Sequence, residues 1–285
     1  MEINKLNRDD IPQRLRDIHT PPKQLFAAGA PLDDLLARKT VAIVGSRKLT
    51  AYGRQVTMEL AERLAEQGVV IISGLALGVD AVAHQAALDA GGLTIAVLPS
   101  PLEEIYPVGH RRLAQAILDQ GGAVISEFPA GTPAFRGNFI ARNRLVSGLG
   151  DALLITEAAE KSGTLHTARF ALEQGRDVLA VPGNITSPTS TGTNNLIKAG
   201  ATPVTSYEDV LYALGIHAHA TTISQVYGRN AEEQAVLDLL LNGNSDGEEL
   251  QRASKLDIAT FNQTLTMLEI SGKIRPLGAN QWALA

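Results

Sequence analysis

Six short apolar runs rich in Val and Ile recur along the middle of the chain, and they constrain the fold more than any other feature. Each run is continuous rather than alternating, which is typical of parallel strands buried on both faces of a sheet. Amphipathic stretches separate the runs, and one of them ends at Gly68. The pattern predicts an α/β fold, an extended Rossmann-like, doubly wound parallel sheet. The predicted strands are 41–44, 69–72, 94–98, 123–126, 152–155 and 177–181.

Four segments follow from this periodicity. Residues 1–39 show weak periodicity, so we expect a short irregular N-terminal leader with at most one short helix. The Rossmann-like domain spans 40–214, and residues 215–228 lack a period and are interpreted as a linker. In residues 229–285, three amphipathic stretches precede a predicted hairpin, which is the plan of a winged-helix domain.

Composition narrows the classes of protein. The chain has no cysteine, which excludes disulfide frameworks, thiolate metal sites and a cysteine nucleophile. The first ten residues are polar and no apolar run is long enough to span a bilayer, so we expect a cytoplasmic protein without membrane association. The net charge of −5 argues against a non-specific nucleic-acid coat protein. A DNA site would therefore need a local concentration of cations and backbone donors.

Loops that follow the predicted strands combine glycine with small hydroxyl or amide residues. In a doubly wound sheet, ligands bind beyond the carboxyl ends of the strands. Glycine lets the backbone approach a ligand, and the free N–H groups of a helix start favour an anion. The same residues also serve as ordinary helix caps, but four such loops on one rim favour a phosphate site. The assigned residues are Gly45, Ser46 and Arg47; Ser73 and Gly74; Ser162, Gly163 and Thr164; and Gly192, Thr193 and Asn194.

Basic residues gather around one aromatic residue. Arg136, Arg142 and Arg144 fall within nine positions, near Phe139 and Asn143. Arginine grips phosphate and stacks on bases, and an aromatic among arginines is typical of a single-strand groove. We place all five residues in a DNA-binding surface. An alternative is that Arg142 and Arg144 pair with carboxylates such as Glu127 and Glu157, and composition alone supports a surface role for only one of the two.

Common cofactor motifs are missing. There is no GxGxxG and no Walker lysine motif, so a dinucleotide dehydrogenase or a P-loop ATPase is not expected. His84 and His166 lack further ligands at fitting spacing, so we predict no metal site. Neither a cofactor nor a catalytic residue is assigned.

Ordered motifs over about residues 40–212 resemble the DprA (Smf) family of bacterial DNA-processing proteins. They begin with Val-Ala-Ile-Val-Gly-Ser-Arg at 41–47 and Ser-Gly-Leu-Ala-Leu-Gly-Val-Asp at 73–80. Arg-Asn-Arg at 142–144, Ser-Gly-Thr at 162–164 and Gly-Thr-Asn at 192–194 follow in the family's order. Ile140 departs from the pattern, because the family usually has a proline there.

The resemblance implies a protein that binds and protects single-stranded DNA and forms a homodimer through the Rossmann-like domain. It also implies that the protein loads RecA recombinase on incoming DNA during natural transformation. Arg47 and its loop carry over as phosphate contacts, and Phe139 with the 142–144 segment carries over as lining of the same pocket.

An enzyme of the phosphoribohydrolase type is the alternative on a related Rossmann fold. That family typically carries a Pro-Gly-Gly-x-Gly-Thr loop followed closely by glutamate, whereas this chain reads Ser-Gly-Thr-Leu-His-Thr at 162–167. Glycosidic cleavage favours well-placed carboxylates, and His166 or Thr167 takes the expected position of the acid. Asp80 and Glu157 remain as candidate acids, but we favour a binding protein that is not an enzyme.

Overall fold

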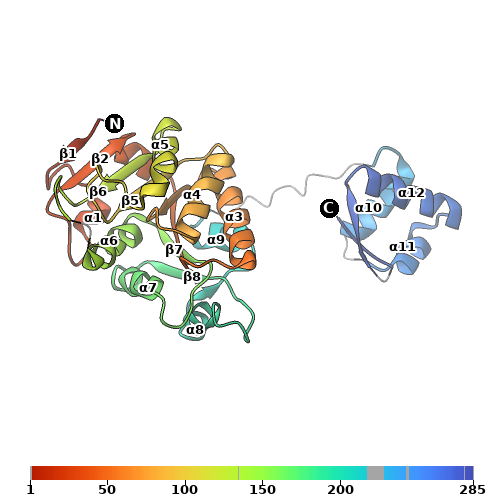
Figure 1. Ribbon diagram of the computed structural model, residues 1–285. Coiled ribbons are helices and arrows are strands. Elements are labelled where there is room, and N and C mark those ends of the chain that lie inside the picture. The colour runs from red at the N-terminus through yellow and green to blue at the C-terminus, as the bar shows by residue number, and fades with distance from the viewer. Residues whose placement is uncertain (1, 134, 217–227, 242–243, 279, 285) are drawn as a thin grey trace. The chain divides into compact units, whose positions relative to one another are not determined.

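The computed structural model describes residues 2–133, 135–216, 228–241, 244–278 and 280–284. The chain divides into two compact units, residues 1–217 and residues 218–285 (Figure 1). The predicted linker at 215–228 falls largely outside the described residues. We call residues 1–217 the α/β unit and residues 218–285 the C-terminal unit.

Six parallel strands form the centre of the sheet in the α/β unit, and the prediction of a doubly wound parallel sheet is confirmed. The full sheet has nine strands in the order β1-β2-β6-β5-β4-β3-β7-β8-β9. Side chains of the central strands are almost all buried, which explains why their sequences read as continuous apolar runs. The six are β3 (Thr40–Val44), β4 (Val70–Ser73), β5 (Thr94–Leu98), β6 (Ala123–Ser126), β7 (Ala152–Ile155) and β8 (Asp177–Ala180).

The N-terminal segment is part of this sheet, so the expectation of an irregular leader over 1–39 is wrong. Strands β1 (Asn4–Leu6) and β2 (Leu25–Gly29) pair antiparallel with each other, and β2 pairs antiparallel with β6. Two short helices, α1 (Gln13–Arg16) and α2 (Leu32–Leu36), accompany them. At the other edge, β9 (Thr202–Pro203) pairs with β8 over two residues.

Long-range contacts explain why a weakly periodic segment is ordered. Leu15 and Leu25 are fully buried in the core of the α/β unit. The Arg14 guanidinium donates to the carbonyls of Leu36 and Leu149 and forms an ion pair with Asp151 at 3.1 Å. Arg14 also donates to the Thr40 hydroxyl at 2.9 Å, so its contacts join the segment to the start of β3 and to the turn before β7.

Helices cover both faces of the sheet (Figure 1). Ala42, Ile72 and Ile95 point to one face, whereas Val41 and Ile71 point to the other, as the alternation of side chains along a strand requires. The first face packs against α1, α2, α6 (Arg136–Leu149), α7 (Thr164–Glu173) and α8 (Thr191–Lys198). The second packs against α3 (Ala51–Glu66), α4 (Val79–Asp89), α5 (Arg111–Asp119) and α9 (Tyr207–Ala213).

The C-terminal unit has three helices followed by a two-stranded hairpin, as predicted for a winged helix. The elements are α10 (Ala231–Leu241), α11 (Gly247–Ser254), α12 (Ile258–Ile270), β10 (Ile274–Gly278) and β11 (Gln281–Leu284). Asp246 and Asp257 cap the starts of α11 and α12 by accepting backbone N–H bonds. The unit has its own apolar core, which includes Val236, Phe261 and Leu268.

Candidate functional site

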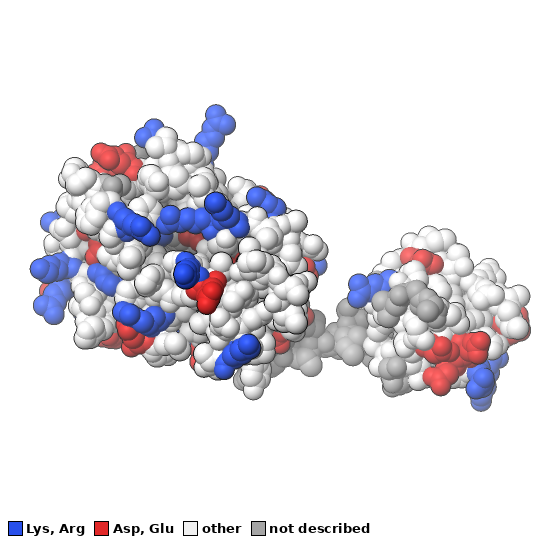
Figure 2. Space-filling model, turned by 60° about the horizontal axis from the view of Figure 1, so that its bottom comes forward, with Lys and Arg blue, Asp and Glu red and all other residues white. Residues whose placement is uncertain are grey.

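A pocket of about 1110 Å³ lies at the carboxyl ends of the central strands. The loops after β3, β4, β5, β7 and β8 contribute to its wall, together with the first half of α6. Figure 2 shows Lys and Arg side chains around a hollow of the α/β unit. Ten of the predicted site residues line this pocket: Gly45, Ser46, Arg47, Arg136, Phe139, Arg142, Asn143, Ser162, Gly163 and Thr164.

A cation and two aromatic rings meet at the pocket wall. The guanidinium of Arg47 lies over the Phe139 ring, 5.0 Å from its centroid. The Tyr106 ring contacts Phe139 edge to face, with 5.4 Å between centroids and an interplanar angle of 81°. Such contacts are favourable by the cation–π and quadrupole attractions of aromatic rings. We call these three side chains the stacking group, and it presents both π surface and positive charge to the pocket.

The backbone of the β3 loop is held close to its neighbours. Ser46 N donates to the carbonyl of Glu157 at 2.8 Å, and Thr164 Oγ1 donates to the carbonyl of Gly45 at 3.0 Å. Gly78 has φ +86, and a Cβ atom there would lie 2.1 Å from the Ser46 carbonyl oxygen. A side chain at that position would therefore push the loop out of place, which accounts for the glycine.

Arg142 forms the floor of the pocket. Its side chain is 97% buried and donates Nη1 to the carbonyls of Gly74 and Val97. Asp80 is also buried and accepts from the backbone N–H groups of Gly74 and Ala76, at 3.1 and 3.4 Å. Burial lowers the pKa of Arg142 to about 10 and raises the pKa of Asp80, while the opposite charge of each residue opposes the other's shift. Arg142 therefore stays charged at neutral pH, and it orders the β4 loop from beneath.

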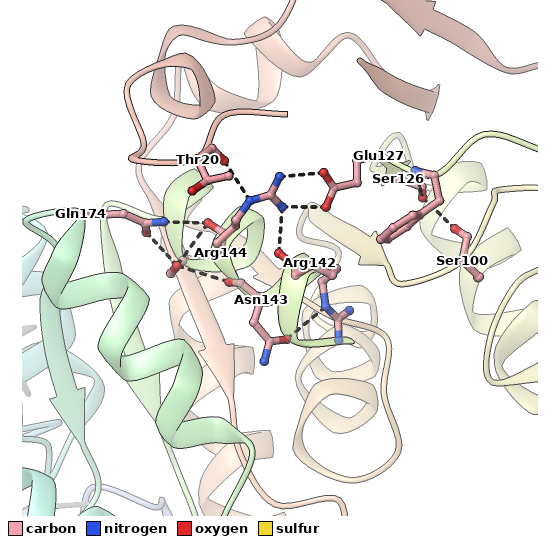
Figure 3. A network of polar contacts seen from close by, with 11 residues as sticks. Thr20, Ser100, Ser126, Glu127, Arg142, Asn143, Arg144 and Gln174 are labelled. Carbon is pink, nitrogen blue, oxygen red and sulfur yellow. Dashed lines mark hydrogen bonds and ion pairs between the residues drawn. The ribbon is translucent and has the colours of Figure 1, made fainter. Parts of the chain in front are cut away.

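Arg144 was predicted to share a DNA-binding surface with Arg142, but it does not line the pocket. Its guanidinium forms two hydrogen bonds to the Glu127 carboxylate, at 2.6 and 2.7 Å, and donates to the carbonyls of Thr20 and Ala141 (Figure 3). Residues two positions apart on a helix point to nearly opposite sides. Arg142 and Arg144 consequently cannot face the same pocket. The alternative of pairing with Glu127 is correct for Arg144, whereas Arg142 lies beside Asp80 and not Glu157.

The remaining predicted residues support loops and do not line the pocket. Asn194 clamps the backbone of Gly183, accepting from its N–H at 3.1 Å and donating to its carbonyl at 3.0 Å. Gly192 N donates to the Ala158 carbonyl at 2.8 Å. Thr193 Oγ1 bonds the Ser190 carbonyl, and Ser73 Oγ bonds the Ile43 carbonyl. Gly74 lines a small cavity of about 50 Å³ that shares Arg47, Tyr106 and Phe139 with the pocket.

Two lysines and two aromatic residues are among the pocket residues that were not predicted as site residues. Lys48 directly follows Arg47, and Lys161 directly precedes Ser162, so both adjoin predicted loops. Tyr106 and Phe135 were missed because neither lies beside a glycine-rich loop. Counting these, five cations line the pocket against the carboxylates of Asp80 and Glu160. This excess of positive charge favours an anionic ligand.

Two kinds of feature are missing from the described part of the chain. No helix there is both long and apolar enough to cross a membrane. Within the same residues, no group of three or more His, Asp or Glu side chains could hold a metal ion. The pocket itself is lined by arginines, lysines, aromatic rings and glycine-containing loops.

The chain matches known proteins over both units. Residues 3–215 match the family model for DNA recombination-mediator protein A, and residues 224–280 match the model for the DprA winged-helix domain. Protein Smf of Escherichia coli is 50% identical over 179 residues, which are 63% of this chain and 48% of that protein. DNA processing protein DprA of Bacillus subtilis is 40% identical over 209 residues, 73% of this chain and 70% of that protein. The chain thus spans about half the length of the E. coli relative.

Solved structures agree with these matches. The X-ray structure of DprA from Streptococcus pneumoniae is 40% identical, with a TM-score of 0.69 over 74% of each chain. A structure of DprA from Helicobacter pylori, described as showing a single-stranded DNA binding mode, is 35% identical, with a TM-score of 0.67. The match covers 75% of this chain and 95% of the H. pylori chain. On the family models, the sequence identities and these structures together, the chain belongs to the DprA (DNA recombination-mediator protein A) family.

Proposed function

We propose that the chain binds single-stranded DNA in the pocket of the α/β unit and that it is not an enzyme. The observation that carries this proposal is the stacking group of Arg47, Phe139 and Tyr106 at the wall of a cation-rich pocket. Single-strand binders combine aromatic surfaces, on which bases stack, with cations that follow the phosphates. The pocket offers both at one place, and its volume of about 1110 Å³ exceeds the range of small-molecule sites, about 300–1,000 Å³.

The relatives support the same ligand. The H. pylori relative is described by its single-stranded DNA binding mode, and other relatives are named as DNA processing proteins. By analogy with the family, we extend the proposal to a cytoplasmic homodimer that protects incoming DNA. We also propose that the protein loads RecA recombinase on that DNA during natural transformation.

The candidate acids of a phosphoribohydrolase are engaged in holding the fold. Asp80 lines the pocket, but it accepts two backbone N–H bonds and lies in the field of Arg142. Glu157 is buried and does not line the pocket, and its Oε2 accepts from the backbone N and the hydroxyl of Thr50. One oxygen of each carboxylate is thus held by the fold and both residues are buried, which supports a binding protein over a hydrolase.

The test compares one labelled oligonucleotide as a single strand and as a duplex by fluorescence anisotropy over a salt series. We expect tighter binding of the single strand, with log affinity falling against log salt by about 0.7 per phosphate contact. Equal affinity for both forms, or no dependence on salt, would contradict the proposal. Incubation with nucleoside monophosphates should release no free base. RecA loading is tested separately, by RecA assembly on the same strand with and without the protein.

A further inference from the structure

The structure carries a second exposed surface that adjoins the pocket. Leu77 in the loop after β4 is 56% exposed, and Val108 in the 3-10 turn η1 (Val108–His110) is 62% exposed. Tyr106, which lines the pocket and precedes η1 by two residues, is 44% exposed. We define these three residues with Arg111 and Arg112 as the α5 surface. Large apolar side chains that gather in one place on a surface indicate a binding site more than scattered ones do.

The α5 surface is continuous with the pocket. Leu77 and Tyr106 line the small cavity of about 50 Å³ together with Arg47 and Phe139. The ring Nδ1 of His110 lies 2.8 Å from the carbonyl oxygen of Leu75, which ties η1 to the loop that carries Leu77. A ligand that leaves the stacking group on this side therefore reaches Leu77 and Val108 next.

Two exposed cations follow at the start of α5. The side chains of Arg111 and Arg112 form no ion pair or hydrogen bond with any residue that the structure describes. They lie in the first turn of the helix, where the helix dipole disfavours positive charge. Neither the stability of the helix nor an ion pair accounts for them, but an anionic ligand does. The same connection begins with the exposed carboxylates of Glu103 and Glu104, and its positive charges, Arg111 and Arg112, lie at its end.

We propose that the single strand leaves the pocket over Tyr106, Leu77 and Val108 and that Arg111 and Arg112 contact its phosphates. This inference rests on the proposed function, because it extends the same strand. Apolar and aromatic surface interleaved with cations is the chemistry that recognises bases and phosphates in turn. A protein partner would use the apolar residues but has less need for two unpaired arginines beside them.

The test compares a short oligothymidine of about five nucleotides, sufficient for the pocket, with one of about fifteen nucleotides. In the chain of residues 1–285, Arg111→Gln with Arg112→Gln should weaken binding of the long strand by about tenfold. The salt slope should become shallower by about 1.4, the loss of two phosphate contacts. Binding of the short strand should not change. Leu77→Ser with Val108→Ser should weaken the long strand without changing the slope, because apolar contacts release no counterions.

A matched control is available in Arg38 and Lys39. They are also adjacent and exposed, but they directly precede β3 and so lie at the amino end of that strand, whereas the pocket lies at the carboxyl ends. Arg38→Gln with Lys39→Gln should leave both oligonucleotides unaffected. Unchanged long-strand affinity and slope in the Arg111 and Arg112 variant would overturn the inference and leave the α5 surface to a protein partner. Failure of the unmodified protein to bind even the short strand would instead overturn the proposed function.

Discussion

The guanidinium carbon of Arg47 lies 5.0 Å from the centroid of the Phe139 ring, although the two residues come from the β3 loop and from helix α6. In the proposed function, the pair brings a cation for a phosphate and an aromatic ring for a base to one point of the pocket wall. In the proposed complex, a base that stacks on this face of Phe139 displaces the guanidinium of Arg47, which then contacts a phosphate. The two side chains therefore make separable contributions, one dependent on salt and one independent of it.

Arg47→Ala should weaken single-strand binding and make the salt slope shallower by about 0.7, the loss of one phosphate contact. The measurement is fluorescence anisotropy with a labelled oligonucleotide over a salt series. Arg38→Ala serves as the control, because Arg38 lies near the amino end of β3, away from the pocket. An unchanged slope in a folded Arg47 variant would place Arg47 outside the site.

Phe139→Ala should weaken binding by about 1–3 kcal/mol, the contribution of stacking per base, and leave the salt slope unchanged. Phe139→Trp is the matched control, because it keeps an aromatic face and should retain binding. Phe139 is only half-buried, so thermal stability should change little. A loss of several kcal/mol in stability would show that Phe139 acts as a core residue.

Truncation after Ile216, which packs against the core of the α/β unit, should leave most of the single-strand affinity intact. Residues 225–285 carry five basic and eight acidic side chains, and no Lys or Arg lies between Lys255 and Lys273, the stretch that contains α12. An uncharged or acidic helix face is a poor reader of DNA, because phosphates repel acidic groups within a Debye length of about 8 Å. A large drop in affinity on truncation, with the α/β unit folded, would show that the C-terminal unit contacts DNA.

Glu127→Ala should destabilise the α/β unit by about 3 kcal/mol, because it leaves the largely buried guanidinium of Arg144 without its carboxylate. Glu173→Ala removes the exposed ion pair with Arg169 and should cost less than about 1 kcal/mol. Urea unfolding measures both. The salt slope of DNA binding should stay the same in the Glu127 variant, and a change in that slope would return Arg144 to the binding surface.

Acidification should destabilise the α/β unit through His84. Burial lowers the pKa of His84 to about 3, and Nδ1 lies 2.6 Å from the Thr94 hydroxyl. That hydroxyl already donates to the Ile71 carbonyl, so Nδ1 carries the proton and the ring is neutral. The unfolded chain binds a proton below about pH 6.5 and the folded chain does not until about pH 3, so stability falls across this window.

From pH 7 to pH 5 the loss should amount to about 2 kcal/mol. His84→Gln removes the titrating group, so urea unfolding of this variant should show a pH dependence weaker by that amount, whatever its stability at pH 7. An equal pH dependence in both proteins would contradict a neutral, buried His84.

The central strands were predictable because burial on both faces requires apolar side chains at nearly every position. Each strand is therefore visible in the sequence as a short continuous apolar run. Strands β1 and β2 were not predictable from the sequence. They are ordered by the pairing of β2 with β6 and by the contacts of Arg14 with residues far along the chain. Such contacts leave no periodic pattern in a segment of three to five residues.

The site was predictable to the extent that strand ends and glycine-rich loops identify a rim. Composition alone could not assign Arg142 and Arg144, although their spacing on a helix already implied that they face different ways. Tyr106 lies at the pocket because its loop folds back on α6, and only the tertiary structure shows that contact.

The two edges of the sheet are unusually short. Strand β1 has three residues, and β9 has two, of which Pro203 lacks a backbone N–H. An incoming strand would find few donors and acceptors with which to extend the ladder at either end. The α/β unit is thereby protected from growing into fibres edge to edge. Association of two copies through strand pairing, or binding of a peptide as an added strand, would gain few hydrogen bonds at either edge.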